Sequence, residues 1–123
     1  MSLRKVYSER ELLEQKAYVG PYNGMTKTFD WTGAETDSII WTPESGNRFV
    51  VSLIAINVTD TCTVSIFDED DADVDILFKG TLSANSTVII PYEIPRNSRD
   101  PNRHLRATTS AAGGYITVWG WEL

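Results

Sequence analysis

The chain has 123 residues, of which 41% are hydrophobic, and a formal net charge of −6. This length suits one domain with a real core, and the hydrophobic fraction excludes a disordered chain. Because Asp and Glu outnumber Lys and Arg by 17 to 11, the surface repels phosphate backbones and no nucleic-acid partner is expected.

The first predicted element is a short helix in an N-terminal arm over residues 1–22. Ser8 and Glu11 fit a capping box that starts a helix, and Gly20-Pro21 would end it. A helix of two or three turns is marginal unless it docks on something. It would therefore cap one end of the domain or reach a neighbouring subunit. Its candidate contact residues are Leu3, Val6, Tyr7, Leu12 and Leu13.

Neither export nor a membrane span is predicted. The basic residues at the start are not followed by the apolar segment of a signal peptide, and no apolar run approaches about 20 residues. We therefore expect a chain made in the host cytoplasm, with no membrane partner.

From Met25 onward hydrophobic residues recur with a period of two, which predicts strands separated by Gly-, Asn- and Pro-rich breaks. The expected strands are Thr26–Trp31, Ser38–Thr42, Arg48–Thr59, Cys62–Phe67, Asp75–Phe78, Ser86–Tyr92, Leu105–Ser110 and Tyr115–Trp121. Residues 23–123 are thus expected to form an all-β, antiparallel β-sandwich, jelly-roll-like, with about eight strands.

The third expected strand, Arg48–Thr59, is apolar on both faces. Strict alternation places Val50 with Ile54 on one face and Val51 with Leu53 on the other. We expect this strand to be central and covered on both sides for part of its length.

An acidic run follows the fourth strand. Its carboxylates would chelate calcium, contact a basic partner or remain solvated at a turn. The solvated loop is favoured, because the run lacks the Gly and the distal Glu of an EF-hand. The candidate contact residues are Asp68, Glu69, Asp70, Asp71, Asp73 and Asp75. No metal site and no cofactor are predicted.

The loop over residues 95–103 concentrates basic charge in Arg96, Arg99 and Arg103. The acidic run of a like molecule would complement it, so the two loops are candidates for a contact between subunits. A solvated loop fits the sequence equally well.

No catalytic residue is predicted. The only histidine, His104, stands beside Arg103, which disfavours its protonation, and no nucleophile elbow, phosphate-binding glycine loop or paired metal-ligand motif is present. The only cysteine, Cys62, excludes an intramolecular disulfide. It shares a strand face with Val64 and is expected to be a buried small hydrophobe.

The last expected strand, Tyr115–Trp121, is also apolar on both faces. Ile116 and Val118 share one face, while the other carries the aromatic residues Tyr115, Trp119 and Trp121. One face should fill the sandwich. The aromatic face would belong to the core, to a subunit interface or to a platform for sugar rings.

The segments Leu82–Pro91 (LSANSTVIIP) and Leu105–Ser110 (LRATTS), with the closing glycine-flanked strand, resemble small tailed-bacteriophage virion proteins built on jelly-roll-like sandwiches. The resemblance covers Phe49 to the last residue. It implies a non-enzymatic virion protein: a capsid decoration (cement) protein first, or a tail or fibre component. Such proteins are often trimers whose N-terminal arm contacts the major capsid protein, other virion proteins or neighbouring copies. A carbohydrate-binding sandwich is the alternative from another class.

Overall fold

The computed structural model describes residues 24–69, 75–111 and 113–123. They form the strands β1 (Met25–Trp31), β2 (Glu35–Trp41), β3 (Phe49–Val58), β4 (Cys62–Asp68), β5 (Ile76–Leu82), β6 (Ser86–Asn97), β7 (Leu105–Thr109) and β8 (Gly114–Glu122). The predicted N-terminal arm and its helix lie outside the described residues, as do Asp70, Asp71 and Asp73.

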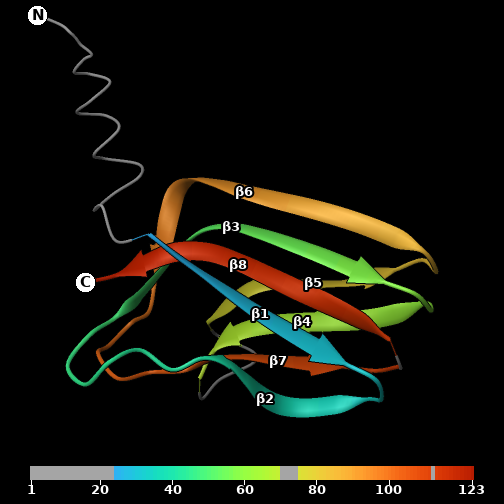
Figure 1. Ribbon diagram of the computed structural model, residues 1–123, viewed down its shortest axis with the longest axis horizontal. Coiled ribbons are helices and arrows are strands. Elements are labelled where there is room, and N and C mark those ends of the chain that lie inside the picture. The colour runs from blue at the N-terminus through green and yellow to red at the C-terminus, as the bar shows by residue number, and fades with distance from the viewer. Residues whose placement is uncertain (1–23, 70–74, 112) are drawn as a thin grey trace, which may run out of the picture.

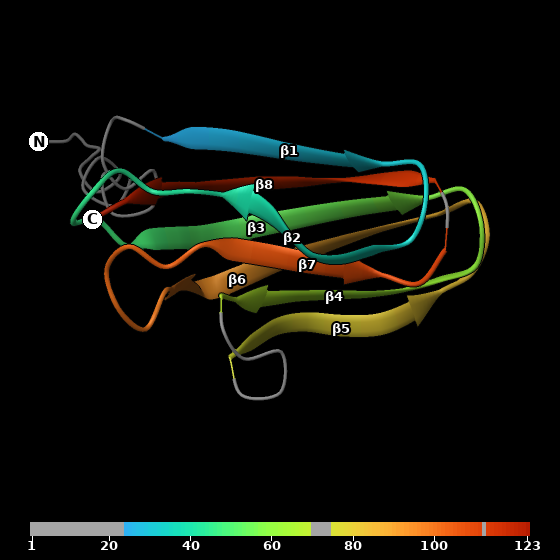
Figure 2. The same cartoon turned by 90° about the horizontal axis from the view of Figure 1, so that it is seen from below.

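The eight strands form two antiparallel sheets of four that pack face to face (Figure 1, Figure 2). Sheet A has the order β1-β8-β3-β6 and sheet B the order β2-β7-β4-β5. The pairs β1/β2, β3/β4, β5/β6 and β7/β8 each place one strand in each sheet, so the chain crosses between the sheets as in a jelly roll. The predicted all-β, jelly-roll-like sandwich of eight strands is confirmed.

The core lies between the two sheets, because each strand directs alternate side chains inward. Its fully buried members include Ile54, Ile56, Ile116 and Val118 from sheet A and Val64, Ile66 and Leu105 from sheet B. Cys62 belongs to the same cluster, as its alternation with Val64 predicted. A free thiol in this position acts as a packed apolar group.

Two strands, β5 and β6, end at least four residues beyond their predicted ends. β6 continues through Pro91 and Pro95, although the prediction ended it at Tyr92. Proline lacks a backbone N–H, which an edge strand tolerates because one side of it has no strand partner. β5 likewise continues through Gly80, where a Cβ would lie 3.2 Å from the Phe78 ring. That ring covers the space that glycine leaves.

A β-bulge at Ser52 determines which side chains of β3 face the core. Val51 pairs with Gly120 and Leu53 with Trp119, so Ser52 is an extra residue without a partner in β8. The extra residue reverses the alternation, and Val51 rather than Val50 joins the core cluster. The expected central position of β3 is confirmed, but the predicted sharing of a face by Val50 and Ile54 is wrong.

Glu122, at the end of β8, ties that strand to the β2–β3 connection. Its carboxylate accepts hydrogen bonds from the Trp41 indole at 2.9 Å, the Asn47 amide at 2.9 Å and the Glu44 backbone N–H at 3.0 Å. Burial alone would raise the pKa of Glu122, but these hydrogen bonds and the charge of Lys27 outweigh it. The pKa is therefore lowered from its ordinary value of 4.5.

We expect acid to destabilise the fold partly through Glu122. A folded-state pKa below 4.5 contributes stability that is present above pH 4.5 and is lost as the pH falls through the lowered value. Glu122→Gln should reduce the fall in unfolding free energy over that range, whereas Glu93→Gln, at an exposed position of β6, should not. Urea titrations at a series of pH values measure this. The same acid profile in Glu122→Gln and the wild type would contradict it.

Candidate interaction surface

The outward side of sheet A carries three rows of side chains, each of which crosses all four strands. We call these rows the sheet A face. The first row is Thr26, Trp119, Leu53 and Pro91; the second is Thr28, Thr117, Ala55 and Ile89; the third is Asp30, Tyr115, Asn57 and Thr87. The rows follow from strand pairing, since residues paired across a sheet point to the same side. Asp30 is the only charged residue in them.

Large apolar side chains on the sheet A face are exposed. Trp119 is 37% exposed, Tyr115 47% and Ile89 62%. Single exposed hydrophobic residues are normal on protein surfaces, but contiguous ones mark contact surfaces. These side chains share the face with Leu53 and Ala55 of β3, which lies between β8 and β6.

The outward side of sheet B has a different chemistry. Ser65 of β4 lies between Thr108 of β7 and Lys79 of β5, and Arg106 of β7 pairs with Ile39 of β2. The row of Ser65 thus carries hydroxyl and charged groups, whereas the row of Arg106 also holds Ile39, Phe67 and Ile76. Phe67 is buried and Ile39 is 45% exposed, so the sheet A face is distinguished by its exposed aromatic residues.

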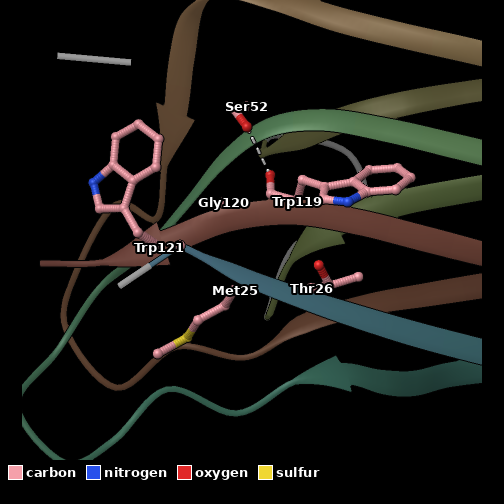
Figure 3. A pocket seen from close by; sticks show the side chains of 7 residues that line it. Met25, Thr26, Ser52, Trp119, Gly120 and Trp121 are labelled. Carbon is pink, nitrogen blue, oxygen red and sulfur yellow. Dashed lines mark hydrogen bonds between the residues drawn. The ribbon is translucent and has the colours of Figure 1, made fainter. Parts of the chain in front are cut away.

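A hollow of about 230 Å³ opens at one end of the sheet A face. It is lined by Gly24, Met25, Thr26, Ser52, Trp119, Gly120 and Trp121. Figure 3 shows Trp119 and Trp121 on either side of Gly120, with Ser52 opposite them on β3 and donating a 2.9 Å hydrogen bond to the Trp119 carbonyl. The volume is below the roughly 300–1,000 Å³ of small-molecule sites. It therefore suits a single inserted side chain.

Gly120 allows the close approach of β8 and β3 that shapes this hollow. A Cβ on Gly120 would overlap the Val50 carbonyl oxygen and lie 3.2 Å from the Val51 Cα. The obstruction is backbone, which cannot rotate away as a side chain does. Only glycine fits opposite the bulge.

The sequence prediction for the last strand is confirmed in part. Ile116 and Val118 fill the sandwich, and the aromatic face points outward. Tyr115 and Trp119 are exposed, so they do not belong to the core, while Trp121 is buried on the outer side. Whether this face binds a subunit or a sugar stays a prediction.

Sequence reasoning missed the residues that other strands add to this surface, among them Leu53, Ile89 and Pro91. The alternation of Ile89 with the inward-facing Val88 and Ile90 showed that one side of β6 points outward. Nothing local showed that β6 would lie two strands away from the aromatic strand β8.

The acidic and basic loops meet within one chain. Arg103 Nε lies 2.7 Å from Asp68 Oδ1, and Arg99 Nη2 lies 2.7 Å from Asp75 Oδ1. Asp68, which is 3% exposed, also accepts the Arg99 backbone N–H at 2.8 Å. Arg96 donates to the Ile76 carbonyl at 3.1 Å. A contact between these loops of two copies stays a prediction, and it would compete with these intrachain pairs.

Glu69 joins the end of β4 to the start of β7. Its carboxylate accepts the His104 backbone N–H at 2.7 Å, and it lies 3.0 Å from His104 Nδ1 and 3.4 Å from Arg106 Nη2. Burial alone would raise the pKa of Glu69, but the bonds from His104 and Arg106 lower it overall. His104 thus makes an inter-strand contact.

Within residues 24–69, 75–111 and 113–123, no three or more His, Cys, Asp or Glu side chains are grouped so that they would hold a metal ion. The same ranges contain no helix with the length and apolar content that crossing a membrane requires.

The fold and the surface define a jelly-roll sandwich whose sheet A face carries exposed aromatic and aliphatic residues and one charged residue, Asp30. No protein-family model matches the sequence, and no curated protein matches it. The chain is similar to the coat protein of Tobacco streak virus in two solved structures, a C2 crystal form at 2.1 Å and a dimer at 2.4 Å. Both are 14% identical with a TM-score of 0.35, and the match covers 81% of this chain and 87% or 88% of the coat protein chain. A likeness of this size carries no argument about function.

Proposed function

We propose that this chain is a non-enzymatic virion structural protein, specifically a capsid decoration protein that binds and stabilises the assembled head. The observation that carries the proposal is the sheet A face, where Tyr115, Trp119 and Ile89 are exposed on an almost uncharged surface. Such a surface favours burial against protein. The resemblance of the segments Leu82–Pro91 and Leu105–Ser110 to phage virion proteins supports the virion setting.

The mechanism is stabilisation by mass action. A protein that binds the assembled shell but not its separate subunits stabilises the shell in proportion to occupancy. In this proposal residues 1–22 bind the capsid protein, and the sandwich faces its neighbours. With a net charge of −6, the chain favours a basic or neutral partner surface.

We expect deletion of residues 1–17 to abolish binding to heads purified from a virus that lacks this chain. The core cluster of the described residues is formed by residues 25–118, so we expect the deletion to leave the sandwich folded. Co-sedimentation with the heads measures binding, and near-UV circular dichroism of the tryptophans reports folding. In the full chain, a Leu12→Ser, Leu13→Ser double variant should weaken binding, whereas the polar control Gln15→Ser should not. If the folded deletion variant still binds heads, then residues 1–17 are not needed for binding and the proposed mechanism is wrong on this point.

The rival function, recognition of host polysaccharide, is motivated by the exposed rings of Tyr115 and Trp119, because sugars stack on such rings. Titration of the full chain with host surface polysaccharide separates the two functions. Decoration predicts unchanged tryptophan fluorescence, whereas saturable quenching that Trp119→Ser removes would favour the rival. Binding to purified tails rather than heads would place the chain among tail or fibre components.

A further inference from the structure

We infer that Tyr22 of this chain fills the hollow beside Trp119 and thereby anchors the N-terminal segment on the sheet A face. Residues 1–23 join the described sandwich at Gly24, which is itself one of the residues that line the hollow. The occupant is therefore a segment of the same chain, and Tyr22 is the side chain that it inserts. This segment binds heads in the proposed function, so the role of the contact, though not its existence, rests on that function.

The hollow lies where β1 offers no side chain. Met25 of β1 pairs with Gly120 of β8. One position further along the same register, Gly24 stands opposite Trp121, and alternation gives it the same side of the sheet as Thr26. Among the described residues, one atom lies within 4 Å of the place that a Cβ on Gly24 would take, the Gly120 carbonyl oxygen at 3.9 Å. The space over Gly24 is therefore open, and it belongs to the hollow.

Another edge strand of this chain shows how the space over a glycine is filled. Gly80 of β5 follows Phe78 by two residues, and a Cβ on Gly80 would lie 3.2 Å from the Phe78 ring. Both β5 and β1 are edge strands, with a strand partner on one side only. Tyr22 precedes Gly24 by the same two residues, so an extended chain sets both on one side. An aromatic ring at this spacing covers the glycine as Phe78 covers Gly80.

The size and the lining of the hollow suit a tyrosine ring. A volume of about 230 Å³ takes one side chain rather than a small-molecule ligand. The walls include Trp119 and Trp121 on either side of Gly120 (Figure 3), and aromatic rings attract one another beyond the area that they bury. The apolar body of Tyr22 would contact Trp119, while its hydroxyl would remain in water at the open side of the hollow.

Covalent attachment gives Tyr22 an advantage over any separate molecule. One residue separates it from Gly24, so little chain has to be ordered to close the contact. Its effective concentration at the hollow is correspondingly high. Residues 1–23 hold four Lys or Arg and three Asp or Glu, whereas the rest of the chain holds seven and 14. These opposite net charges favour a segment that stays close to the sandwich.

Nuclear magnetic resonance of the full chain of 13.8 kDa tests the contact directly. We expect nuclear Overhauser effects from the ring protons of Tyr22 to the Trp119 indole and to the Thr26 methyl group. Effects from Tyr18 in place of Tyr22, or from no residue of the segment 1–23, would overturn the inference. Effects seen only between two differently labelled copies would also overturn it, because the ring would then come from a second copy.

Acrylamide quenching of tryptophan fluorescence measures the cover over Trp119, because the other three tryptophans are at most 9% exposed. We expect Tyr22→Ser to raise the quenching constant about twofold, since it removes the ring that packs on the indole. Tyr22→Phe keeps the ring and should match the wild type. The control Tyr7→Ser removes a ring far from Gly24 and should match it too. Equal quenching constants of Tyr22→Ser and the wild type would contradict the contact.

The anchoring contact and the proposed function can fail separately. If the Tyr22 ring contacts Trp119 in a chain that does not bind heads, then the anchor stands and the proposed function is wrong. If heads bind a chain that lacks this contact, then the anchor is wrong and the proposed function stands.

Discussion

Replacing Gly120 by alanine is expected to lower the free energy of unfolding by about 3 kcal/mol or more, one of the largest effects of any single methyl group in this chain. The new Cβ would overlap the Val50 carbonyl oxygen, so β3 and β8 must separate at the bulge. That separation breaks strand pairing in the middle of sheet A. Urea unfolding followed by tryptophan fluorescence measures the change.

Gly33→Ala is the matched control for Gly120→Ala. No atom lies within 4 Å of the position that a Cβ on Gly33 would take, so this variant should change stability by less than about 0.5 kcal/mol. Equal stabilities of the two variants would show that β3 and β8 adjust freely at the bulge. The account of Gly120 as a required close approach would then be wrong.

Asp68→Ala is expected to destabilise the fold by about 3 kcal/mol, because it removes the 2.7 Å ion pair of the mostly buried Arg103 and leaves Asp75 at 3.5 Å and Asp100 at 3.9 Å to face that charge. The Asp68 side chain is 4% exposed and that of Arg103 16%, and their contact distance is 2.7 Å. The variant also removes the acceptor of the Arg99 backbone N–H. Thermal and urea unfolding both measure the loss.

Asp100→Ala provides the comparison for Asp68→Ala. Its carboxylate lies 3.9 Å from the same Arg103, but its side chain is mostly exposed. Exposed ion pairs contribute about 0–1 kcal/mol, so the loss should be small. If the two variants lose the same stability, then the buried pair does not hold the β4–β5 and β6–β7 connections together.

Much of the fold could be predicted from the sequence, because alternation is a local property of each strand. The period of two predicted all eight strands and the burial of Cys62. Features that depend on pairing between distant strands could not be predicted in this way. The bulge at Ser52 lies beside Gly120 of β8, which is distant in the sequence, and Pro95 is tolerated because β6 is an edge strand.

Only the part of the candidate surface that lies on a single strand could be recognised in the sequence. The sequence showed that the strand of Tyr115 and Trp119 is apolar on both faces, but only the structure shows that the aromatic face points outward. The contribution of Ile89 required the strand order of sheet A. The acidic and basic loops were recognised as complementary, but only the fold shows that Asp68 and Arg103 meet within one chain.

The two outer faces of the sandwich differ in the side chains that they present. Sheet B presents hydroxyl and charged groups such as Thr108 and Lys79, which water satisfies, whereas sheet A presents Tyr115 and Trp119. A jelly roll has no need of exposed aromatic residues for its own stability, because its core lies between the sheets. Their exposure is the observation on which the proposed role in assembly rests.

The most direct test of the proposed function is the heat stability of virus heads that lack this chain, measured as the purified full-length chain is added. Decoration predicts saturable binding and a dissociation temperature that rises with occupancy. Heads that do not bind the chain, or that bind it to saturation with no change in stability, would contradict the account.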